Sequence, residues 1–264
     1  MKKYLVIGNP IEHSMSPKVH NYWLNENNIN GIYEKKKLNP EEIKNIIAEV
    51  RDNKITGINV TIPFKKDVIP YLDKLSNESS ITKSVNTIYL ENNEVIGHNT
   101  DIFGFEHSLK KANYNLKNKN VFILGAGGVV PSIIYSLQKA GVSNIFLSNR
   151  TKSKAEELKN FFENLNVIDW GILPDFDMII NATSIGLNKN DKINLNFTSV
   201  NKDNLFYDVI YNPEETNFLR TGRELGAQVI NGKMMFIYQA FEAFKLWHKI
   251  SPKVNEEIFK LLNQ

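Results

Sequence analysis

The sequence predicts an α/β protein of two domains, each with a largely parallel sheet covered by helices. Short β-branched strands alternate with amphipathic helices from one end of the chain to the other. A glycine-rich turn joins an apolar strand to a helix near residue 125, and the alternation begins afresh after Asp101. Alternating elements favour parallel sheets because a parallel connection needs a crossover, which is usually a helix. The 264 residues suffice for two domains of modest size.

The first set of elements precedes residue 101. Runs of β-branched and aromatic residues that end at Gly, Asn or Pro are typical of strands. Pro40 suits the first turn of a helix, where its missing N–H removes no hydrogen bond. These signals predict strands at residues 4–7, 31–36, 55–60, 85–90 and 94–98, and helices at 16–27 and 40–52.

The second set follows Asp101 and includes the glycine-rich turn. Gly141 suits the position after a helix C-terminus, and Thr151 or Ser153 can cap a helix N-terminus. We expect a domain boundary near residue 101. The predicted strands are 120–124, 144–148, 178–181, 205–210 and 227–230, and the predicted helices are 102–111, 131–140, 151–164, 214–225, 234–249 and 252–262.

Composition excludes several kinds of protein. There are no cysteines, which excludes disulfides, thiolate metal ligands and a cysteine nucleophile. The net charge is +3 without a dense block of lysine and arginine, so no nucleic-acid partner is expected. His13 and His98 lack metal-ligand spacing, so no metal site is expected. The N-terminal apolar run ends at Gly8, too short for a signal peptide, and no segment suits a membrane span, so we expect a cytoplasmic protein.

The segment from Val121 to Pro131 has the order strand, glycine-rich turn, helix. Gly125 permits a tight turn, and Gly127 lets the backbone approach a pyrophosphate, which the positive end of the following helix attracts. Val130 stands where this fingerprint usually has a third small residue. The segment predicts a Rossmann-like nucleotide site, with a structural turn that binds no ligand as the alternative.

The end of the next strand indicates which dinucleotide would bind. An NAD site usually has an acidic residue here, but the chain has Asn149-Arg150-Thr151-Lys152-Ser153-Lys154. Asn149 can bond a ribose hydroxyl, and Arg150 with Lys152 or Lys154 can bind a 2′-phosphate. The strand end therefore favours NADP over NAD, and the alternative is a solvated basic helix start.

Four polar stretches of the first half, residues 14–17, 59–65, 85–87 and 97–101, lie mostly near the carboxyl ends of predicted strands. Open α/β sheets bind ligands at that edge. Each stretch also has an ordinary explanation. Ser14 or Ser16 could cap a helix, and Thr61 and Asn86 could be turn residues. Lys65 and Asp101 could form a surface ion pair of little energetic value.

Together with the glycine-rich turn, these stretches resemble the shikimate dehydrogenase family over essentially the whole chain. Motifs that recur in a fixed order are far more specific than one glycine turn. Two of them are Ser14-Met15-Ser16-Pro17 and Asn59-Val60-Thr61-Ile62-Pro63-Phe64-Lys65. The full series comprises residues 8–11, 14–17, 57–65, 85–87, 97–104, 125–128, 149–151, 181–187 and 208–213, with Gln239.

The resemblance implies an N-terminal α/β substrate domain with a mostly parallel sheet, a Rossmann-like NADP-binding domain, and a cleft between them. Residues 1–101, completed by the helices of 236–264, would form the first domain, and residues 102–235 the second. It further implies an NADP-dependent oxidoreductase that reversibly reduces 3-dehydroshikimate to shikimate, in chorismate and aromatic amino-acid biosynthesis, as a monomer or homodimer.

The resemblance also implies roles for individual residues. Lys65 and Asp101 would be catalytic. Ser14 and Ser16 would bind the substrate carboxylate, and the ring hydroxyls would be held by Thr61, Asn86, Asp101 and Gln239, with Tyr211 nearby. Ile210 and Gly232 would line the nicotinamide pocket, and the other cofactor-binding residues would be Gly125, Ala126, Gly127, Gly128, Val129, Asn149, Arg150, Thr151, Lys154 and Thr183.

Reduction of a ketone needs a hydride donor, which NADPH supplies, and a group that neutralises the developing alkoxide. The Lys65 ammonium can stabilise that charge and give up a proton, while Asp101 would orient it. A neighbouring carboxylate favours the charged form of Lys65, and burial favours the neutral form. The protonation state of Lys65 therefore stays open.

Three alternatives share parts of this pattern. A quinate or dual quinate/shikimate dehydrogenase often prefers NAD, which Arg150 disfavours. A folate-type methylene dehydrogenase shares the cofactor domain, but the motifs at 14–17 and 59–65 disfavour it. A non-catalytic sensor of shikimate or NADP is disfavoured by Lys65 and Asp101, although Val130 departs from the usual glycine fingerprint.

Overall fold

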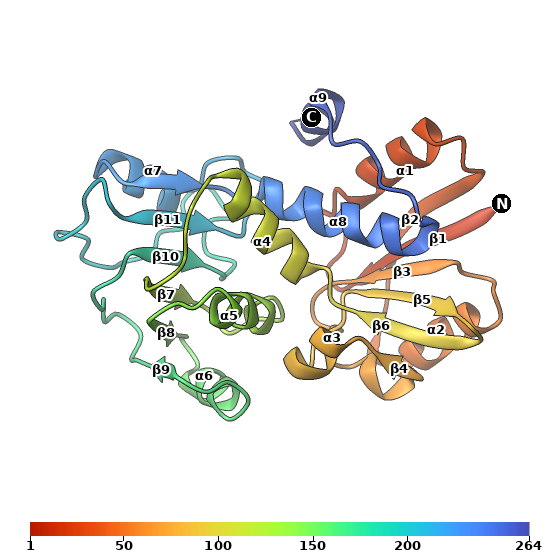
Figure 1. The fold of residues 1–264 in the computed structure, drawn as a ribbon, viewed down its shortest axis with the longest axis horizontal. Helices are drawn as coiled ribbons and strands as arrows, with labels where there is room; N and C mark the ends of the chain where they lie inside the picture. Colours follow the sequence, from red (N-terminus) through yellow and green to blue (C-terminus); the bar gives the residue numbers. More distant parts are fainter. Residues whose placement is uncertain (264) are drawn as a thin grey trace. The chain divides into compact units, whose positions relative to one another are not determined.

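The computed structural model describes residues 1–263, which form two compact units (Figure 1). The first unit comprises Met1–Gly104 and the chain from Ile237 onward, and the second comprises Phe105–Phe236. Both divisions fall inside helices, α4 (Asp101–Lys111) and α8 (Lys233–His248). Residue 264, which the expected first domain includes, lies outside the described residues. Within residues 1–263, none of the helices combines the length and apolarity that a membrane crossing requires.

The first unit has a sheet with strand order β2-β1-β3-β5-β6-β4. β1 (Lys2–Gly8) is parallel to β2 (Gly31–Lys37) and β3 (Gly57–Val60). β5 (Thr87–Glu91) runs antiparallel to β3 and to β6 (Glu94–His98), while β4 (Lys74–Leu75) is parallel to β6. The sheet is therefore mostly parallel with an antiparallel hairpin, which turns at Asn92 and Asn93, both at positive φ as in a type I′ turn.

Side chains of β1 alternate between two covered faces of this sheet. Leu5 and Ile7 belong to a core that includes Ile46 of α2 (Ile43–Arg51). Tyr4 points to the other face, where its ring lies 5.1 Å from that of Trp247 in α8. Since successive side chains of a strand point to opposite faces, β1 is buried on both sides. α1 (Ser16–Glu26) contacts α8 on this second face, through a Trp23–Phe244 ring contact at 5.7 Å.

Short elements complete the first unit, and several of them were not predicted from the sequence. α3 (Asn77–Thr82) is capped by Ser76, whose hydroxyl accepts the Ser79 N–H at 3.2 Å. The predicted helix 252–262 begins later, as α9 (Glu256–Leu262), because the Asn255 side chain caps it. The remaining short elements are the 3₁₀ turns η1 (Pro40–Glu42) and η2 (Ile69–Tyr71) and the strand β4.

The second unit has a fully parallel sheet with strand order β12-β11-β10-β7-β8-β9. From β7 (Asn120–Leu124) the chain builds outward to β8 (Asn144–Ser148) and β9 (Leu165–Val167). It then returns to the other side of β7 for β10 (Met178–Asn181), β11 (Leu205–Asp208) and β12 (Gln228–Ile230), as Figure 1 shows for β7 to β11. This is the doubly wound order, so the predicted Rossmann-like fold is confirmed. Its topological switch point lies at the carboxyl end of β7, where such sheets bind ligands.

Helices cover both faces of this second sheet. Val121 and Ile123 of β7 share a core with Ile133 of α5 (Val130–Lys139), while Phe122 shares another with Phe218 of α7 (Asn217–Glu224). This double burial explains the near-continuous apolar sequence of β7. The predicted helix 151–164 is wrong in its second half, since α6 (Lys152–Lys159) ends early and the chain turns at Asn164, with φ 57°, into the unpredicted β9.

Candidate active site

Lys65 and Asp101 form an ion pair in the first unit. Lys65 lies in the turn after β3, where its carbonyl accepts the Val85 N–H at 2.9 Å, and Asp101 begins α4. Their side chains are only 13% and 9% exposed, so the explanation as a surface ion pair is wrong. A pair so removed from solvent is less screened than a surface pair, and its geometry is held more tightly.

Asn86 is the third member of this group. Its Nδ2 donates to Asp101 Oδ1 at 2.9 Å, and its Oδ1 accepts the Thr100 backbone N–H at 2.7 Å. Because a backbone N–H can only donate, the amide orientation is determined and its nitrogen must face the carboxylate. Asn86 therefore holds one carboxylate oxygen while Lys65 holds the other.

Ser14 and Ser16 lie together at the start of α1. The Ser14 hydroxyl donates to Ser16 Oγ at 3.2 Å and accepts the Ser16 N–H at 3.3 Å. The residue at the cap position is Met15, whose side chain makes no capping hydrogen bond within the described residues, so of the two serines only Ser14 bonds an N–H of the first helical turn. Two adjacent hydroxyls at the positive end of a helix suit an anionic group.

Two further predicted substrate residues, Thr61 and Gln239, belong to the same unit. Thr61 directly follows β3 and is half-buried, and its N–H donates to the Ile7 carbonyl at 2.9 Å. Gln239 lies on α8 and is also half-buried. Tyr211 lies in the second unit, where its ring stacks on Phe236 with centroids 4.3 Å apart.

The glycine-rich turn occupies the switch point of the second unit. Gly125 has φ +105°, and a Cβ there would lie 2.8 Å from the Ala182 carbonyl oxygen, so only glycine fits. Gly127 and Gly128 are exposed just before α5. Val130, the departure from the fingerprint, is fully buried in the core of this unit. An exposed glycine pair at a helix start fits a pyrophosphate group.

The end of β8 supplies the polar side chains expected for a 2′-phosphorylated ribose. The Asn149 side chain accepts the Ala126 N–H at 3.2 Å and donates to the Thr151 carbonyl at 2.8 Å, which places it against the glycine turn. Lys152 forms an ion pair with Asp169 at 2.7 Å. Arg150 and Lys154, both exposed, are therefore the better candidates for binding a phosphate.

The buried carboxylate of Asp208, at the end of β11, bonds several polar groups at the carboxyl edge of this sheet, and no role was predicted for it from the sequence. It accepts hydrogen bonds from the Asn181 side chain (3.1 Å), the Thr216 hydroxyl (2.6 Å) and the Ile210 N–H (3.0 Å). Burial raises the pKa of Asp208 to about 6, although these three donors oppose the rise. Asn181 also accepts from the Thr183 hydroxyl at 2.7 Å.

Gly232 adjoins the same segment. Its N–H donates to the Ile210 carbonyl at 3.0 Å, and a Cβ at Gly232 would lie 2.2 Å from the Val209 carbonyl oxygen. Hydrogen bonds thus connect three predicted cofactor residues to the carboxyl edge of the parallel sheet. Thr183 bonds Asn181, Ile210 bonds Asp208, and Gly232 bonds Ile210.

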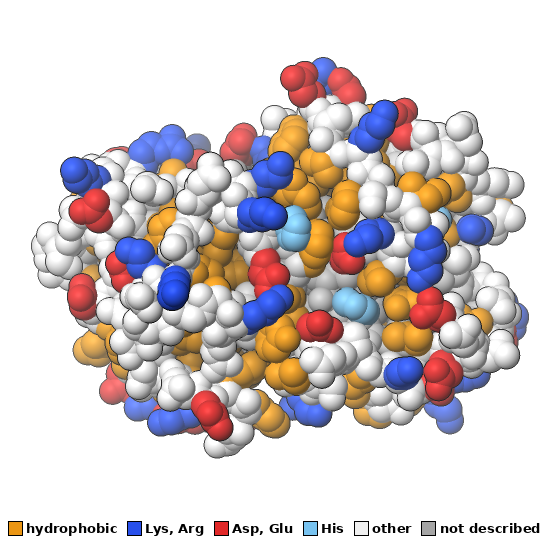
Figure 2. Space-filling view, viewed as in Figure 1, with side chains coloured by type: hydrophobic (Ala, Val, Ile, Leu, Met, Phe, Trp, Pro, Cys, Tyr) orange, Lys and Arg blue, Asp and Glu red, His pale blue; other side chains and the backbone are white. Residues whose placement is uncertain are grey.

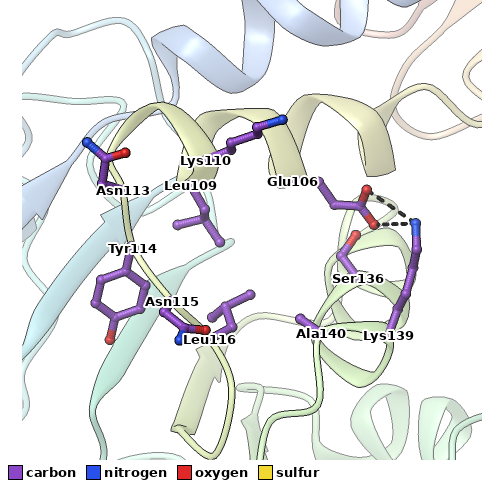
Figure 3. Close-up of a pocket in the computed structure, with 10 residues that line it drawn as sticks. All are labelled: Glu106, Leu109, Lys110, Asn113, Tyr114, Asn115, Leu116, Ser136, Lys139 and Ala140. Carbon is purple, nitrogen blue, oxygen red and sulfur yellow. Dashed lines mark hydrogen bonds and ion pairs between the residues drawn. The ribbon is translucent and has the colours of Figure 1, made fainter.

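A surface pocket of about 550 Å³ in the second unit lies apart from these residues (Figure 3). It is bounded by α4, the segment 113–116 and the end of α5, and Glu106 and Lys139 form an ion pair on one side of it at 3.0 Å. None of its lining residues belongs to the predicted site, so the pocket lies outside the predicted cofactor-binding residues. Figure 2 shows basic and acidic side chains interspersed on one face, with no continuous basic field there.

Comparison with known proteins decides the family. Residues 6–88 match the family described as "Shikimate dehydrogenase substrate binding domain", and residues 107–209 match "Shikimate / quinate 5-dehydrogenase". A protein of Pelagibacter ubique (strain HTCC1062) named "Shikimate dehydrogenase (NADP(+))" is 56% identical over 262 residues, which cover 99% of each chain. This chain belongs to the shikimate dehydrogenase family.

Solved structures of shikimate dehydrogenases share the whole fold. The crystal structure of the Aquifex aeolicus enzyme has a TM-score of 0.91 at 36% identity, covering 100% of this chain and 98% of that one. The Thermus thermophilus enzyme, crystallised in complex with NADP(H) and shikimate, has a TM-score of 0.90 at 29% identity, covering 100% and 99%. The predicted family and fold class are confirmed, while the roles of individual residues stay predictions.

Proposed function

We propose that this chain is an NADP-dependent shikimate dehydrogenase. It reversibly reduces 3-dehydroshikimate to shikimate, a step in chorismate and aromatic amino-acid biosynthesis. The observation that carries the proposal is the Lys65–Asp101 pair, nearly buried and held by Asn86, in a member of this family. Such a pair suits proton transfer to and from a substrate oxygen.

Lys65 is the proton donor in this proposal. Bound NADPH supplies a hydride to the ketone carbon. The carbonyl electron pair moves onto oxygen, and Lys65 Nζ gives that oxygen a proton, which yields the alcohol and a neutral lysine. Asp101 holds Nζ through the ion pair, and Asn86 holds Asp101. In the oxidation direction Lys65 accepts the hydroxyl proton as the hydride leaves.

The other polar side chains of the first unit orient the substrate. Ser14 and Ser16 would hold its carboxylate, because two hydroxyls at a helix start offer donors to an anion. Thr61, Asn86, Asp101 and Gln239 would hold its ring hydroxyls, with Tyr211 as a further contact. A carboxylate held at one end and hydroxyls held at the other would specify which ring carbon carries the reacting oxygen.

The second unit would bind the cofactor. The glycine turn, Gly125 to Val129, would hold the pyrophosphate at the switch point. Asn149, Arg150, Thr151 and Lys154 would bind the adenosine 2′-phosphate end, since residues 149–154 include basic side chains and no acidic residue. Ile210 and Gly232 would border the nicotinamide, and Thr183 would be a further cofactor contact.

The test is a spectrophotometric assay of the purified protein with shikimate and NADP⁺, followed at the NADPH absorbance band. Rapid NADPH formation with this pair, and slow reaction with quinate or NAD⁺, is the expected result. Preference for quinate or NAD⁺ would instead support the alternative of a quinate or dual quinate/shikimate dehydrogenase. Tight shikimate binding without turnover would support the sensor alternative. A cytoplasmic location and a monomeric or homodimeric state stay predictions.

A further inference from the structure

The buried hydrogen bonds behind the catalytic pair continue beyond Asn86. Asn59 of β3 donates through Nδ2 to the Asn86 carbonyl oxygen at 3.1 Å and to Thr87 Oγ1 at 3.0 Å. The Tyr33 hydroxyl, on the edge strand β2, donates to Asn59 Oδ1 at 2.7 Å. With the Asn86–Asp101 bond, these contacts join β2 to the start of α4 through residues that are all buried, and the link from Asn59 to Asn86 is made to the Asn86 backbone carbonyl.

The direction of each bond in this series is determined. The Asn86 carbonyl can only accept, so Asn59 must turn its nitrogen toward it and its oxygen toward Tyr33. Tyr33 must then donate, because the Asn59 oxygen offers no proton. Rotation of the Asn59 amide would set two acceptors against each other at Asn86. The single hydroxyl proton of Tyr33 is thus the donor that this amide orientation requires.

Tyr33 is itself held in place. Its ring stacks on the His20 ring of α1, with centroids 4.3 Å apart and planes 3° from parallel. Burial raises the pKa of the Tyr33 hydroxyl, and a hydrogen bond with the Ser16 side chain opposes this rise only in part. The hydroxyl therefore keeps its proton across the pH range in which a dehydrogenase works, and it lies close to one of the proposed carboxylate-binding serines.

We propose that Tyr33 is a positioning residue for the Lys65–Asp101 pair: its hydroxyl orients Asn59, which holds the Asn86 segment that bonds Asp101. This role rests on the proposed dehydrogenase function. Tyr33 is not among the residues proposed to contact the reacting atoms. It acts on the reaction by limiting how far Asn86 and the carboxylate can move.

The first test is Tyr33→Phe, which keeps the ring and its stacking but removes the hydroxyl. Because small misplacements of catalytic groups reduce rates steeply, we expect kcat with shikimate and NADP⁺ to fall about tenfold. The KM for NADP⁺ should stay within about twofold, since the change lies outside the cofactor unit. Tyr22→Phe is the matched control: it removes another hydroxyl of this unit, which accepts from Asn255 at 2.9 Å, and should leave kcat unchanged.

A second variant separates positioning from stability. Tyr33→Phe leaves the Asn59 oxygen buried without a donor, whereas Tyr33→Phe/Asn59→Leu removes both polar partners. The Asn86 carbonyl keeps the Val60 N–H at 2.8 Å, and Thr87 keeps Thr100 at 3.2 Å. We expect the double variant to regain much of the lost thermal stability while kcat stays low.

These results test the positioning role of Tyr33 separately from the proposed dehydrogenase function. Recovery of kcat together with Tm in the double variant, or normal kcat in Tyr33→Phe when the wild type is active, would overturn the positioning role alone. A wild-type protein that forms no NADPH would overturn the proposed function and the positioning role with it.

Discussion

The ammonium of Lys65 contacts the carboxylate of Asp101 with both side chains almost withdrawn from water, at 13% and 9% exposure. Asn86 occupies the second carboxylate oxygen. Removing one partner of such a pair leaves an uncompensated charge, which is destabilising unless solvent or another group reaches it. Stability must therefore be measured beside activity in every variant of this pair.

Lys65→Ala should lower kcat by about 10²–10⁴-fold, the usual contribution of a general acid or base. Lys65→Arg should also be slow, since arginine keeps the positive charge but hardly releases a proton. Steady-state kinetics with shikimate and NADP⁺ measures both, with the exposed neighbour Lys66→Ala as a control. Near-normal turnover and unchanged shikimate KM in Lys65→Ala would remove Lys65 from the reaction.

Arg150→Ser should raise the KM for NADP⁺ about 10- to 100-fold, because arginine–phosphate pairs are among the strongest charge-assisted hydrogen bonds. The weak reaction with NAD⁺ should change little, since NAD⁺ lacks the 2′-phosphate. Lys152→Ala is the control, because Lys152 is already paired with Asp169. Equal losses with NADP⁺ and NAD⁺ in Arg150→Ser would argue against phosphate recognition.

Asp208→Asn should change how stability depends on pH. The pKa of Asp208 is raised from 3.8 to about 6 by burial, so the folded state favours the protonated acid. The contribution of protonated Asp208 to the free energy of unfolding is complete below pH 4 and is lost as the pH rises through 6. The wild type should lose roughly 3 kcal/mol relative to Asp208→Asn over this interval.

Urea unfolding of both proteins at several pH values between 4 and 7 measures that difference directly. Other titrating groups are common to the two proteins and cancel in the comparison. Parallel stability curves over the whole interval would show that Asp208 titrates normally.

His20→Phe should make the protein more resistant to acid. Burial lowers the pKa of His20 from 6.5 to about 3, with the nearby His248 adding to the effect, and neither ring nitrogen of His20 has a hydrogen-bond partner among residues 1–263. The folded state therefore excludes a proton that the unfolded chain binds, and stability present above pH 6.5 is lost as the pH falls toward 3.

Phenylalanine can keep the stacking on Tyr33 without this penalty, so the acid-unfolding midpoint should shift to lower pH. Circular dichroism followed from pH 7 to pH 3 measures the midpoint, and the exposed His13→Ala serves as the control. An unchanged midpoint would show that His20 becomes protonated without loss of the fold.

Much of the fold could be predicted from the sequence, and the failures have physical causes. β7, β8 and β10 were predicted at their observed bounds because apolar runs closed by turn residues are strong strand signals. The antiparallel direction of β5 was missed, although Asn92-Asn93 is the kind of dipeptide that turns a hairpin. β9 was not predicted because the residues between the end of α6 and Asn164 include no glycine or proline that would mark the end of the helix.

The residues of the candidate site could be predicted from the sequence only in part. Lys65, Asn86 and Asp101 stood out through their family motifs, but their burial and the bonds among them depend on the three-dimensional arrangement. Tyr33 and Asn59 are 26 residues apart, and their contact follows from two strands that both flank β1. Nothing local in the sequence indicates such a pairing.

The discontinuous first unit has a consequence for how the chain folds on the ribosome. The second unit is one continuous segment and can assemble once residue 236 has emerged. The first unit begins earlier, yet Tyr4 and His20 have their ring partners Trp247 and Phe244 in a helix made more than 200 residues later. Domains usually fold in the order of their synthesis. Here the first unit cannot complete its core until α8 has been synthesised, and by then the whole second unit has already emerged.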